Sequence, residues 1–457
     1  MPQEQQQIEV LCVCTPPRRI RPLRFRFEDA QHQLHVLPVT DILYEKSTQY
    51  LGIDALVYGC QVLGEQQDLR DIPAAIAGEK ANRHGIILAK SLPAKRMGVK
   101  TGEPIFQAVK KCPQLVTAPP DYALYTQASR RFIALLRSFT PLVEQYSIDE
   151  AWADMTGTER LYGSPVLAAR TIKQQIREQL GFTVNIGISS NKLLAKIAGD
   201  FEKPDRVHTL FPEEIPEKLW PLPVRELFLV GRATEEKLHR LGIRTIGALA
   251  KSDPALLQRY LHKPGLRLWH YANGRCDDAL LPEQPENKGY GNSTTLPADV
   301  TDFPQAERVL LRLCETVGTR LRHDGKAAAC VAVRTRTCQF ENAIHQRQLP
   351  SATNRTAALY DAACQLLRQM WDRRTPLRQL GVQVSAIEDA AFLQYDLFSP
   401  AAPKQCAMDQ VMDTLRQRYG EQVILRASAL GGAALGGGLD PSRRTGVTKP
   451  LTPEAPV

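Results

Sequence analysis

The stretch Glu144-Gln-Tyr-Ser-Ile-Asp-Glu-Ala-Trp-Ala-Asp-Met-Thr-Gly157 decides how this sequence is interpreted. Apolar residues alternate along it, which predicts a β-hairpin or a pair of strands. Asp149 and Glu150 lie side by side within this pattern, where a buried strand would carry apolar residues. Because charged groups are rarely buried unless they are paired or bound to a metal, the two carboxylates are a candidate Mg²⁺ site. The alternative is a solvated turn between two strands.

Composition restricts the class of protein. Of the 457 residues, 43% are hydrophobic and 23% are charged, as in ordinary globular proteins. The net charge of +9 fits a polyanionic partner. The sequence shows no apolar run long enough to span a membrane and no signal peptide. The ten cysteines lack zinc-ligand spacing. We therefore expect a reduced, cytoplasmic protein without membrane contact.

Composition and periodicity divide the sequence into six segments: 1–66, 67–223, 224–283, 288–390, 391–430 and 431–457. The first segment is predicted to be an atypical β-rich module, because apolar residues alternate along several short stretches of it. The second alternates helices with strands, which indicates an α/β unit, and the third is helical. The fourth has a β-α-β-β-α-β order. The fifth is a linker with a C-terminal segment, and the last, rich in Gly, Ala and Pro, is predicted to be a disordered tail.

Lysines that follow predicted strands are candidates for binding phosphate. Lys203 is a stronger candidate than Lys192 or Lys196, because the proline that follows it restrains its backbone. Lys192 and Lys196 share a helix face at positions i and i+4, and a solvated basic face is the alternative for both. Lys95, in Pro93-Ala-Lys-Arg-Met-Gly-Val99, lies on a predicted basic helix after another strand.

Two further features suit binding to the DNA backbone. A helix–hairpin–helix pattern begins at Leu227, and its first turn can present backbone N–H groups to a phosphate. Arg334 and Arg336 alternate on one face of a predicted strand. A plain helical hairpin and a solvated sheet face are the respective alternatives. The turn residues that would contact DNA are Gly231, Arg232 and Thr234.

An apolar peptide, Gln394-Tyr-Asp-Leu-Phe398, follows the last predicted strand and precedes Ser-Pro. Exposed Leu397 and Phe398 on a linker would suit a groove on a partner protein. Local packing against the rest of the chain is the alternative.

Residues from about 70 to 430 resemble the Y-family (translesion) DNA polymerases of the DNA polymerase IV type. The resemblance rests on Tyr146-Ser-Ile-Asp-Glu-Ala151, Ser189-Ser-Asn-Lys192 with Lys203-Pro204, the hairpin turn and the C-terminal peptide, in the family's order. It implies an α+β multidomain fold, a right hand of palm, fingers and thumb followed by a β-α-β-β-α-β little finger.

The resemblance also implies a DNA-dependent DNA polymerase that acts in error-prone translesion synthesis with two Mg²⁺ ions. Asp149 would bridge both ions, and Glu150 would hold the ion that activates the primer 3′-hydroxyl. Lys95 and Lys203 would stabilise charge on the incoming deoxynucleoside triphosphate. The expected partners are primer–template DNA and a sliding clamp, with the enzyme as a monomer. The clamp-binding residues would be Gln394, Leu397 and Phe398.

The N-terminal segment departs from the family pattern, in which a first strand supplies a third metal-binding Asp. Asp54 is the nearest candidate for that ligand, and Glu45 takes its place in another register. We favour a third hypothesis, a separate N-terminal module joined to a polymerase sheet without its central strand, which would leave Asp149 and Glu150 as the only metal ligands. The runner-up function is therefore a catalytically impaired relative that binds DNA and the clamp. A helix–hairpin–helix nuclease is a weaker alternative.

Overall fold

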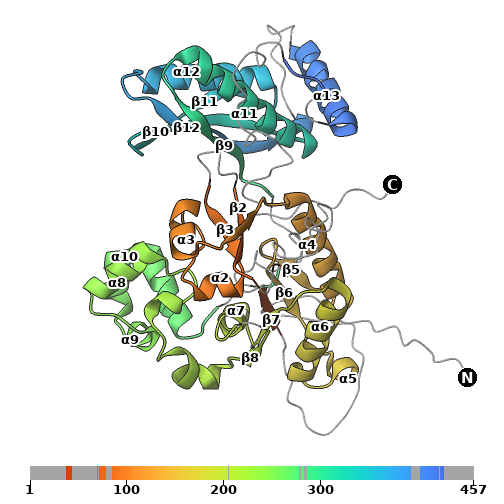
Figure 1. Cartoon of the computed structure of the whole chain (residues 1–457), viewed down its shortest axis with the longest axis vertical. Helices are drawn as coiled ribbons and strands as arrows, with labels where there is room; N and C mark the ends of the chain where they lie inside the picture. Colours follow the sequence, from red (N-terminus) through yellow and green to blue (C-terminus); the bar gives the residue numbers. More distant parts are fainter. Residues whose placement is uncertain are drawn as a thin grey trace, which may run out of the picture. The chain divides into compact units, whose positions relative to one another are not determined.

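The structure is a computed structural model (Figure 1). It describes residues 38–43, 69, 72–78, 85–203, 205–276, 279–281, 286–392, 402–420 and 423–426. These residues form two compact units, one built mainly from residues 38–281 and the other from residues 286–426. In the described part of the chain, every helix is too short or too polar to cross a membrane.

The first unit contains a five-stranded sheet in the order β5-β6-β1-β7-β8. On one face, the helices α4 (Tyr122–Arg137) and α6 (Pro165–Leu180) bury an apolar core that includes Phe132, Ile172 and the alternating residues Ala151 and Ala153. The strands are β5 (Val143–Gln145), β6 (Ala151–Asp154), β1 (Pro38–Leu43), β7 (Asn185–Ile188) and β8 (Val207–Thr209).

Helix α7 (Lys192–Gly199) packs against β1 and β7. Trp152 points away from the Ala151 and Ala153 face, because successive strand residues alternate, and its indole donates a hydrogen bond to the Lys192 carbonyl (3.1 Å). Gly187 permits the close approach of the helix, since a Cβ there would lie 2.0 Å from the Ala195 carbonyl oxygen. A side chain at this position would therefore push α7 off the sheet.

Strand β1 lies in the middle of this sheet. Its backbone pairs antiparallel with β6, Thr40 opposite Trp152, and with β7, Thr40 opposite Gly187. The hypothesis that the sheet lacks a central strand is therefore wrong, and this part of the expected N-terminal module belongs to the sheet. The sequence analysis predicted a β-rich segment here but missed its place in this sheet, because Pro38-Val-Thr-Asp-Ile-Leu43 does not match the family pattern. Asp54 and Glu45 lie outside the described residues.

A smaller sheet and a helical region complete the first unit. The strands β3 (Ile87–Lys90), β2 (Ala74–Ala77) and β4 (Val116–Ala118) form a sheet with the helices α2 (Leu92–Arg96) and α3 (Ile105–Lys111) beside it. The short helix α5 (Glu159–Tyr162) precedes α6. The helical region comprises η1 (Pro212–Glu214), η2 (Ile215–Leu219), η3 (Val224–Glu226), α8 (Arg232–Arg240), α9 (Ile246–Ala250) and α10 (Pro254–Ala272).

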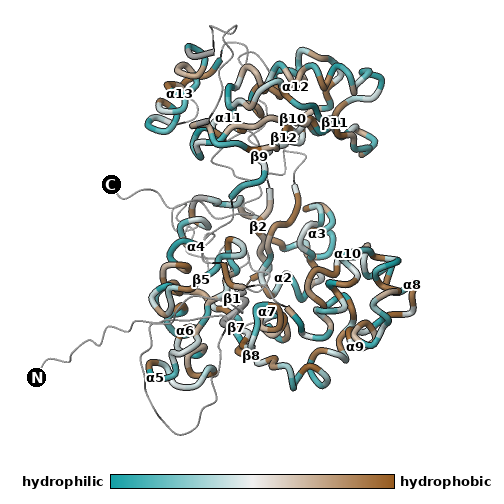
Figure 2. The backbone as a smooth tube through the Cα atoms, turned by 180° about the vertical axis from the view of Figure 1, so that it is seen from behind, coloured by the Kyte–Doolittle hydropathy of each residue, from teal (hydrophilic) through white to brown (hydrophobic). Residues whose placement is uncertain are grey.

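The second unit confirms the predicted β-α-β-β-α-β order. Its sheet, β11-β10-β12-β9, is covered on one face by the amphipathic helices α11 and α12 (Figure 2). The elements in chain order are β9 (Gly289–Val300), α11 (Phe303–His323), β10 (Lys326–Thr337), β11 (Asn342–Thr353), α12 (Thr356–Met370), β12 (Leu377–Asp389) and η4 (Ala390–Phe392).

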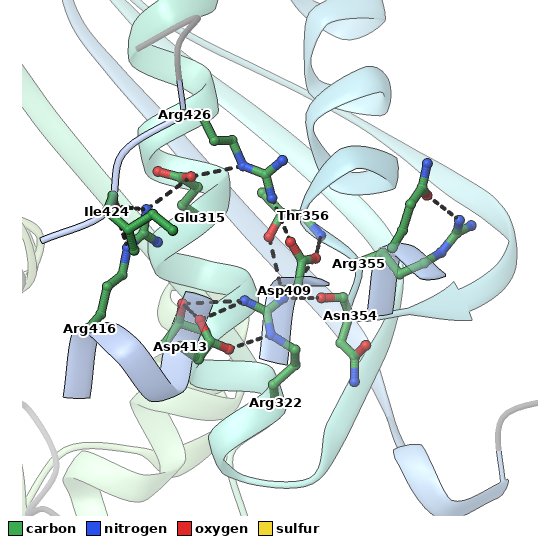
Figure 3. A network of polar contacts seen from close by, with 12 residues as sticks. Glu315, Arg322, Asn354, Arg355, Thr356, Asp409, Asp413, Arg416, Ile424 and Arg426 are labelled. Atoms are coloured by element: carbon green, nitrogen blue, oxygen red, sulfur yellow. Dashed lines mark hydrogen bonds and ion pairs between the residues drawn. The ribbon is translucent and has the colours of Figure 1, made fainter. Parts of the chain in front are cut away.

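A further helix, α13 (Ala402–Tyr419), packs against α11 through buried charges (Figure 3). The Arg322 guanidinium contacts Asp413 (2.6 Å) and Asp409 (3.4 Å). Arg426 joins Asp409 (2.6 Å) to Glu315 on α11 (3.0 Å). The sequence analysis predicted no helix here, because the ion pairs connect residues that lie far apart in the chain.

Candidate functional site

Asp149 and Glu150 lie in the turn that joins β5 to β6, so the predicted hairpin is confirmed. The backbone N–H groups of Tyr146 and Ser147 both donate to the Glu150 carbonyl (2.9 and 3.1 Å) and close the turn. The Ser147 hydroxyl donates to an Asp149 carboxylate oxygen (2.6 Å). Both carboxylates are half-buried at the tip of the sheet. This position leaves them accessible to a ligand while their backbone is fixed.

The Glu150 carboxylate is held by a lysine of α7. Lys196 Nζ lies 3.2 Å from Glu150 Oε1 and 3.2 Å from Asp200 Oδ2. Burial raises the pKa of Glu150 above its usual value, Lys196 opposes this shift, and the neighbouring carboxylates of Asp149 and Asp200 reinforce it. A bound cation would therefore offset the cost of burying this carboxylate.

Lys192 and Lys196 are both buried, so a solvated basic face is the wrong interpretation for this helix. Lys192 Nζ pairs with Glu144 Oε2 (2.7 Å) and lies 4.7 Å from the ring centre of Trp152. Since buried charges need partners, each lysine compensates one carboxylate of the hairpin. Sequence reasoning missed this role, although the signal was present: apolar residues surround both lysines on all sides of α7.

Lys203 lies in the loop after α7. Its Nζ pairs with Asp200 Oδ1 (2.7 Å), and its side chain is only 15% exposed. Burial raises the pKa of Asp200, but Lys196 and Lys203 outweigh it and hold that pKa below its usual value. A chain of charges therefore connects Glu150 to Lys203 through Lys196 and Asp200.

Lys95 is exposed on α2, which is firmly attached to the smaller sheet. Ser91 joins the helix to the sheet. It is fully buried, and its hydroxyl accepts from the N–H groups of Ala94 in α2 (3.2 Å) and Ala74 in β2 (3.0 Å). The same hydroxyl donates to the Ile72 carbonyl (2.7 Å). Lys95 is thus an exposed residue on a fixed backbone.

The donor set at the hairpin fits a magnesium site. Mg²⁺ binds through one or two carboxylates and completes its shell with water and substrate phosphates. Asp149 and Glu150 supply two adjacent carboxylates at a fixed turn. Among the described residues, no group of three or more His, Cys, Asp or Glu side chains is placed to hold a metal. The described protein groups therefore account for part of a coordination shell.

The first turn of the helix–hairpin–helix is open to a partner. Gly231 is the N-cap residue of α8, and its carbonyl accepts from the N–H groups of Thr234 (3.0 Å) and Glu235 (2.9 Å). A Cβ on Gly231 would meet nothing within 4 Å. The Arg232 side chain is 84% exposed and pairs with Glu236 (2.9 Å). Residues 231–233 are all exposed at the N-terminal end of α8, and this end of a helix beside an exposed guanidinium is suited to a phosphate.

Arg334 and Arg336 lie on the face of the second sheet opposite α11 and α12. Val331 and Val333 alternate with them and point into the apolar core. Arg334 is exposed, and Arg336 donates to the Asn342 side chain (2.9 Å). Their cross-strand neighbours are uncharged: Gly381, Gln379, Ile344 and Asn342. Gln394, Leu397 and Phe398 lie outside the described residues.

Comparison with known families identifies three matching regions. Residues 53–200 match the impB/mucB/samB family, and residues 212–243 match the IMS family HHH motif. Residues 287–397 match the impB/mucB/samB family C-terminal domain. The first match contains Asp149 and Glu150, and the second contains the Gly231 turn.

Several curated proteins are similar over most of their length. The DNA polymerase IV of Clostridium acetobutylicum is 41% identical over 368 residues, 80% of this chain and 92% of that protein. That of Moorella thermoacetica is 40% identical over 80% of this chain and 92% of its own. DNA polymerase IV 2 of Bacillus subtilis is 35% identical over 80% of this chain and 90% of its own. A solved Y-family DNA polymerase chimera, 24% identical, covers 77% of this chain and 99% of its own with a TM-score of 0.63, and shows the same fold.

Proposed function

Because the chain belongs to the Y-family of DNA polymerases, of the DNA polymerase IV type, we propose that it performs error-prone translesion synthesis by two-metal nucleotidyl transfer. It is a DNA-directed DNA polymerase with the right-hand and little-finger fold of that family. The observation that carries the mechanism is the pair Asp149–Glu150 at a fixed hairpin tip, with Glu150 held by buried Lys196.

In this mechanism Asp149 would serve as a ligand to both Mg²⁺ ions, and Glu150 as a ligand to the ion that activates the primer 3′-hydroxyl. When bound, the ions lower the barrier to attack on the α-phosphate and neutralise the leaving pyrophosphate. Lys203 and Lys95 bind the triphosphate and offset its charge. Lys196 keeps the Glu150 carboxylate in place before the substrates arrive.

The third carboxylate has a second candidate besides Asp54. Strand β1 runs antiparallel to β6, so its carboxyl end lies at the same end of the sheet as Asp149 and Glu150. Asp41 belongs to this half of β1. We therefore propose that either Asp41 or Asp54 completes the metal site.

The second unit and the thumb would hold primer–template DNA without reading its sequence. Gly231, Arg232 and Thr234 contact one backbone region, and Arg334 and Arg336 contact another. We further propose a cytoplasmic monomer that binds a sliding clamp through Gln394, Leu397 and Phe398. The catalytically impaired relative is disfavoured, because the central strand on which that alternative depended is present.

A primer-extension assay with Mg²⁺ tests the proposal. Extension of an undamaged template and of a template with a lesion is expected. Binding of DNA without extension would support the impaired relative, and cutting of the template would support the nuclease.

Lys203→Ala is expected to raise the dissociation constant for the incoming nucleotide about 10- to 100-fold, because a hydrogen bond to a charged group contributes about 1.5–3 kcal/mol. Single-turnover incorporation over a range of nucleotide concentrations measures it. Lys218→Ala is the matched control, since Lys218 pairs with Glu214 on the surface. Equal constants for the two variants would contradict the role of Lys203.

Arg334→Gln is expected to weaken DNA binding equally for all sequences. It should reduce the slope of log affinity against log salt concentration by about 0.9, the value for one lost phosphate contact. Fluorescence anisotropy with labelled primer–template at several salt concentrations gives this slope. Arg374→Gln, at an exposed arginine paired with Asp372, should leave it unchanged. An unaltered slope for Arg334→Gln would remove this residue from the DNA interface.

A further inference from the structure

Asn185 uses its side-chain amide to hold the loop after α7. It is the first residue of β7 and is 1% exposed. Its Nδ2 donates to the carbonyls of Gly199 and Glu202, both at 3.1 Å. Its Oδ1 accepts from the backbone N–H of Arg206 (3.0 Å). Both amide hydrogens and one acceptor position are thus used on a single loop.

The loop that Asn185 holds is the one that carries Lys203. The last carbonyls of a helix lack intrahelical partners, and Asn185 supplies one to Gly199 at the end of α7. It also bonds the carbonyl of Glu202 in the loop that follows. The bond from Arg206 fixes the loop on the other side of Lys203. Asparagine is disfavoured in strands, so its presence at a buried strand position is explained by these bonds.

A third set of contacts shows that the loop is held from the adjacent helix as well. Lys173 of α6 donates to the Asp205 carbonyl (2.9 Å) and pairs with the Asp205 carboxylate (3.3 Å). Asp205 itself has a positive φ of 61°, in the left-handed region that aspartate adopts more readily than most non-glycine residues. The backbone around Lys203 is therefore held in one conformation.

We propose that Asn185 is a positioning residue for nucleotide binding. It fixes the backbone at Gly199 and Glu202 before Lys203 and at Arg206 after it, so that Lys203 presents its ammonium group without first having to be ordered. Binding groups that are already ordered lose less conformational freedom when the ligand arrives. Asn185 is buried behind the loop and acts on the triphosphate only through Lys203. The inference rests on the proposed role of Lys203.

The experiment is single-turnover incorporation of one deoxynucleotide by the full chain on a primer–template. Asn185→Ala is expected to raise the dissociation constant for the nucleotide about tenfold, the effect of losing about 1.4 kcal/mol of binding. The rate at saturating nucleotide and the affinity for DNA should change less than about threefold. Asn185→Ser keeps a hydroxyl but cannot supply two donors to separate carbonyls, so its nucleotide dissociation constant should rise as in Asn185→Ala. It serves if the alanine variant does not fold.

Thr158→Ala is the control for general loss of stability. Thr158 is also 1% exposed, and its hydroxyl donates to the Met155 carbonyl (2.7 Å), away from the loop. This variant should lower the melting temperature without raising the nucleotide dissociation constant. Equal changes in Thr158→Ala and the Asn185 variants would overturn the inference.

The double variant Asn185→Ala/Lys203→Ala decides whether one residue acts through the other. Its nucleotide dissociation constant should equal that of Lys203→Ala alone, because no cation remains to be positioned. The inference would be overturned if the double variant showed the product of the two single effects on the dissociation constant. It would also be overturned if Lys203→Ala weakened nucleotide binding while both Asn185 variants left it unchanged. If Lys203→Ala itself has no effect, the proposed role of Lys203 fails instead.

Discussion

Asp149→Asn is expected to reduce primer extension by more than about 100-fold while primer–template binding stays at its original strength. Groups that only orient a metal ligand already contribute about 10- to 100-fold, so loss of a direct ligand should cost more. The amide keeps the size of the side chain and can still accept from Ser147, which holds the turn in place. Single-turnover extension rates and DNA affinity, measured in the same buffer, separate catalysis from binding.

Asp154→Asn is the matched control for this variant. Asp154 lies at the far end of β6, and its Oδ1 accepts from the Thr156 backbone (3.1 Å) and hydroxyl (2.7 Å). An asparagine there can make both bonds, so most extension should remain. Comparable losses in the two variants would indicate that Asp149 supports the hairpin and binds no metal.

The same assay identifies the third carboxylate. Asp41→Asn and Asp54→Asn are compared under conditions in which Asp149→Asn is inactive. The residue whose replacement reduces extension to a similar level is the missing ligand. If neither does, Asp41 and Asp54 are both excluded as the third ligand, and Glu45 is the candidate that remains.

Local patterns in the sequence predicted the elements whose structure depends on their neighbours in the chain. The hairpin at Asp149 followed from alternation, the Gly231 turn from its glycine and flanking apolar residues, and the second sheet from regular spacing of strands and helices. In each case the residues that determine the element lie within it. The structure confirmed all three of these elements.

Elements defined by distant partners were not predicted. The central position of β1 depends on pairing with β6 and β7, more than a hundred residues away. The burial of Lys196 depends on Glu150 and Asp200 together, which a helical pattern alone cannot show. Asn185 looked like an ordinary strand residue, because its three partners lie at the end of the next helix and in the loop that follows it. Contacts between residues far apart in the sequence are therefore what the sequence analysis could not predict.

The second prediction concerns the buried ion pairs of helix α13 and the stability of the second unit. Asp409 is 3% exposed and accepts from Arg322, Arg426 and the backbone N–H of Thr356 (2.8 Å). Asp409→Ala should leave the Thr356 N–H without its acceptor and should take from Arg322 and Arg426 one of the two carboxylates that each contacts. Because Asp413 and Glu315 still pair with them, we expect a loss of about 3 kcal/mol, the lower end of the cost of breaking a buried ion pair. Hydrogen exchange at Thr356 and along α13, in the full chain, measures the loss. Both should exchange far faster than in the original protein.

An exposed pair in the same unit provides the comparison. Asp372 contacts Arg374 (3.3 Å), and both side chains are more than half exposed. Asp372→Ala should cost at most about 1 kcal/mol, because water already solvates both groups. The contrast follows from burial, since the number of charges removed is the same. If Asp409→Ala were as mild as Asp372→Ala, the ion pairs of Figure 3 would not be what holds α13 against α11.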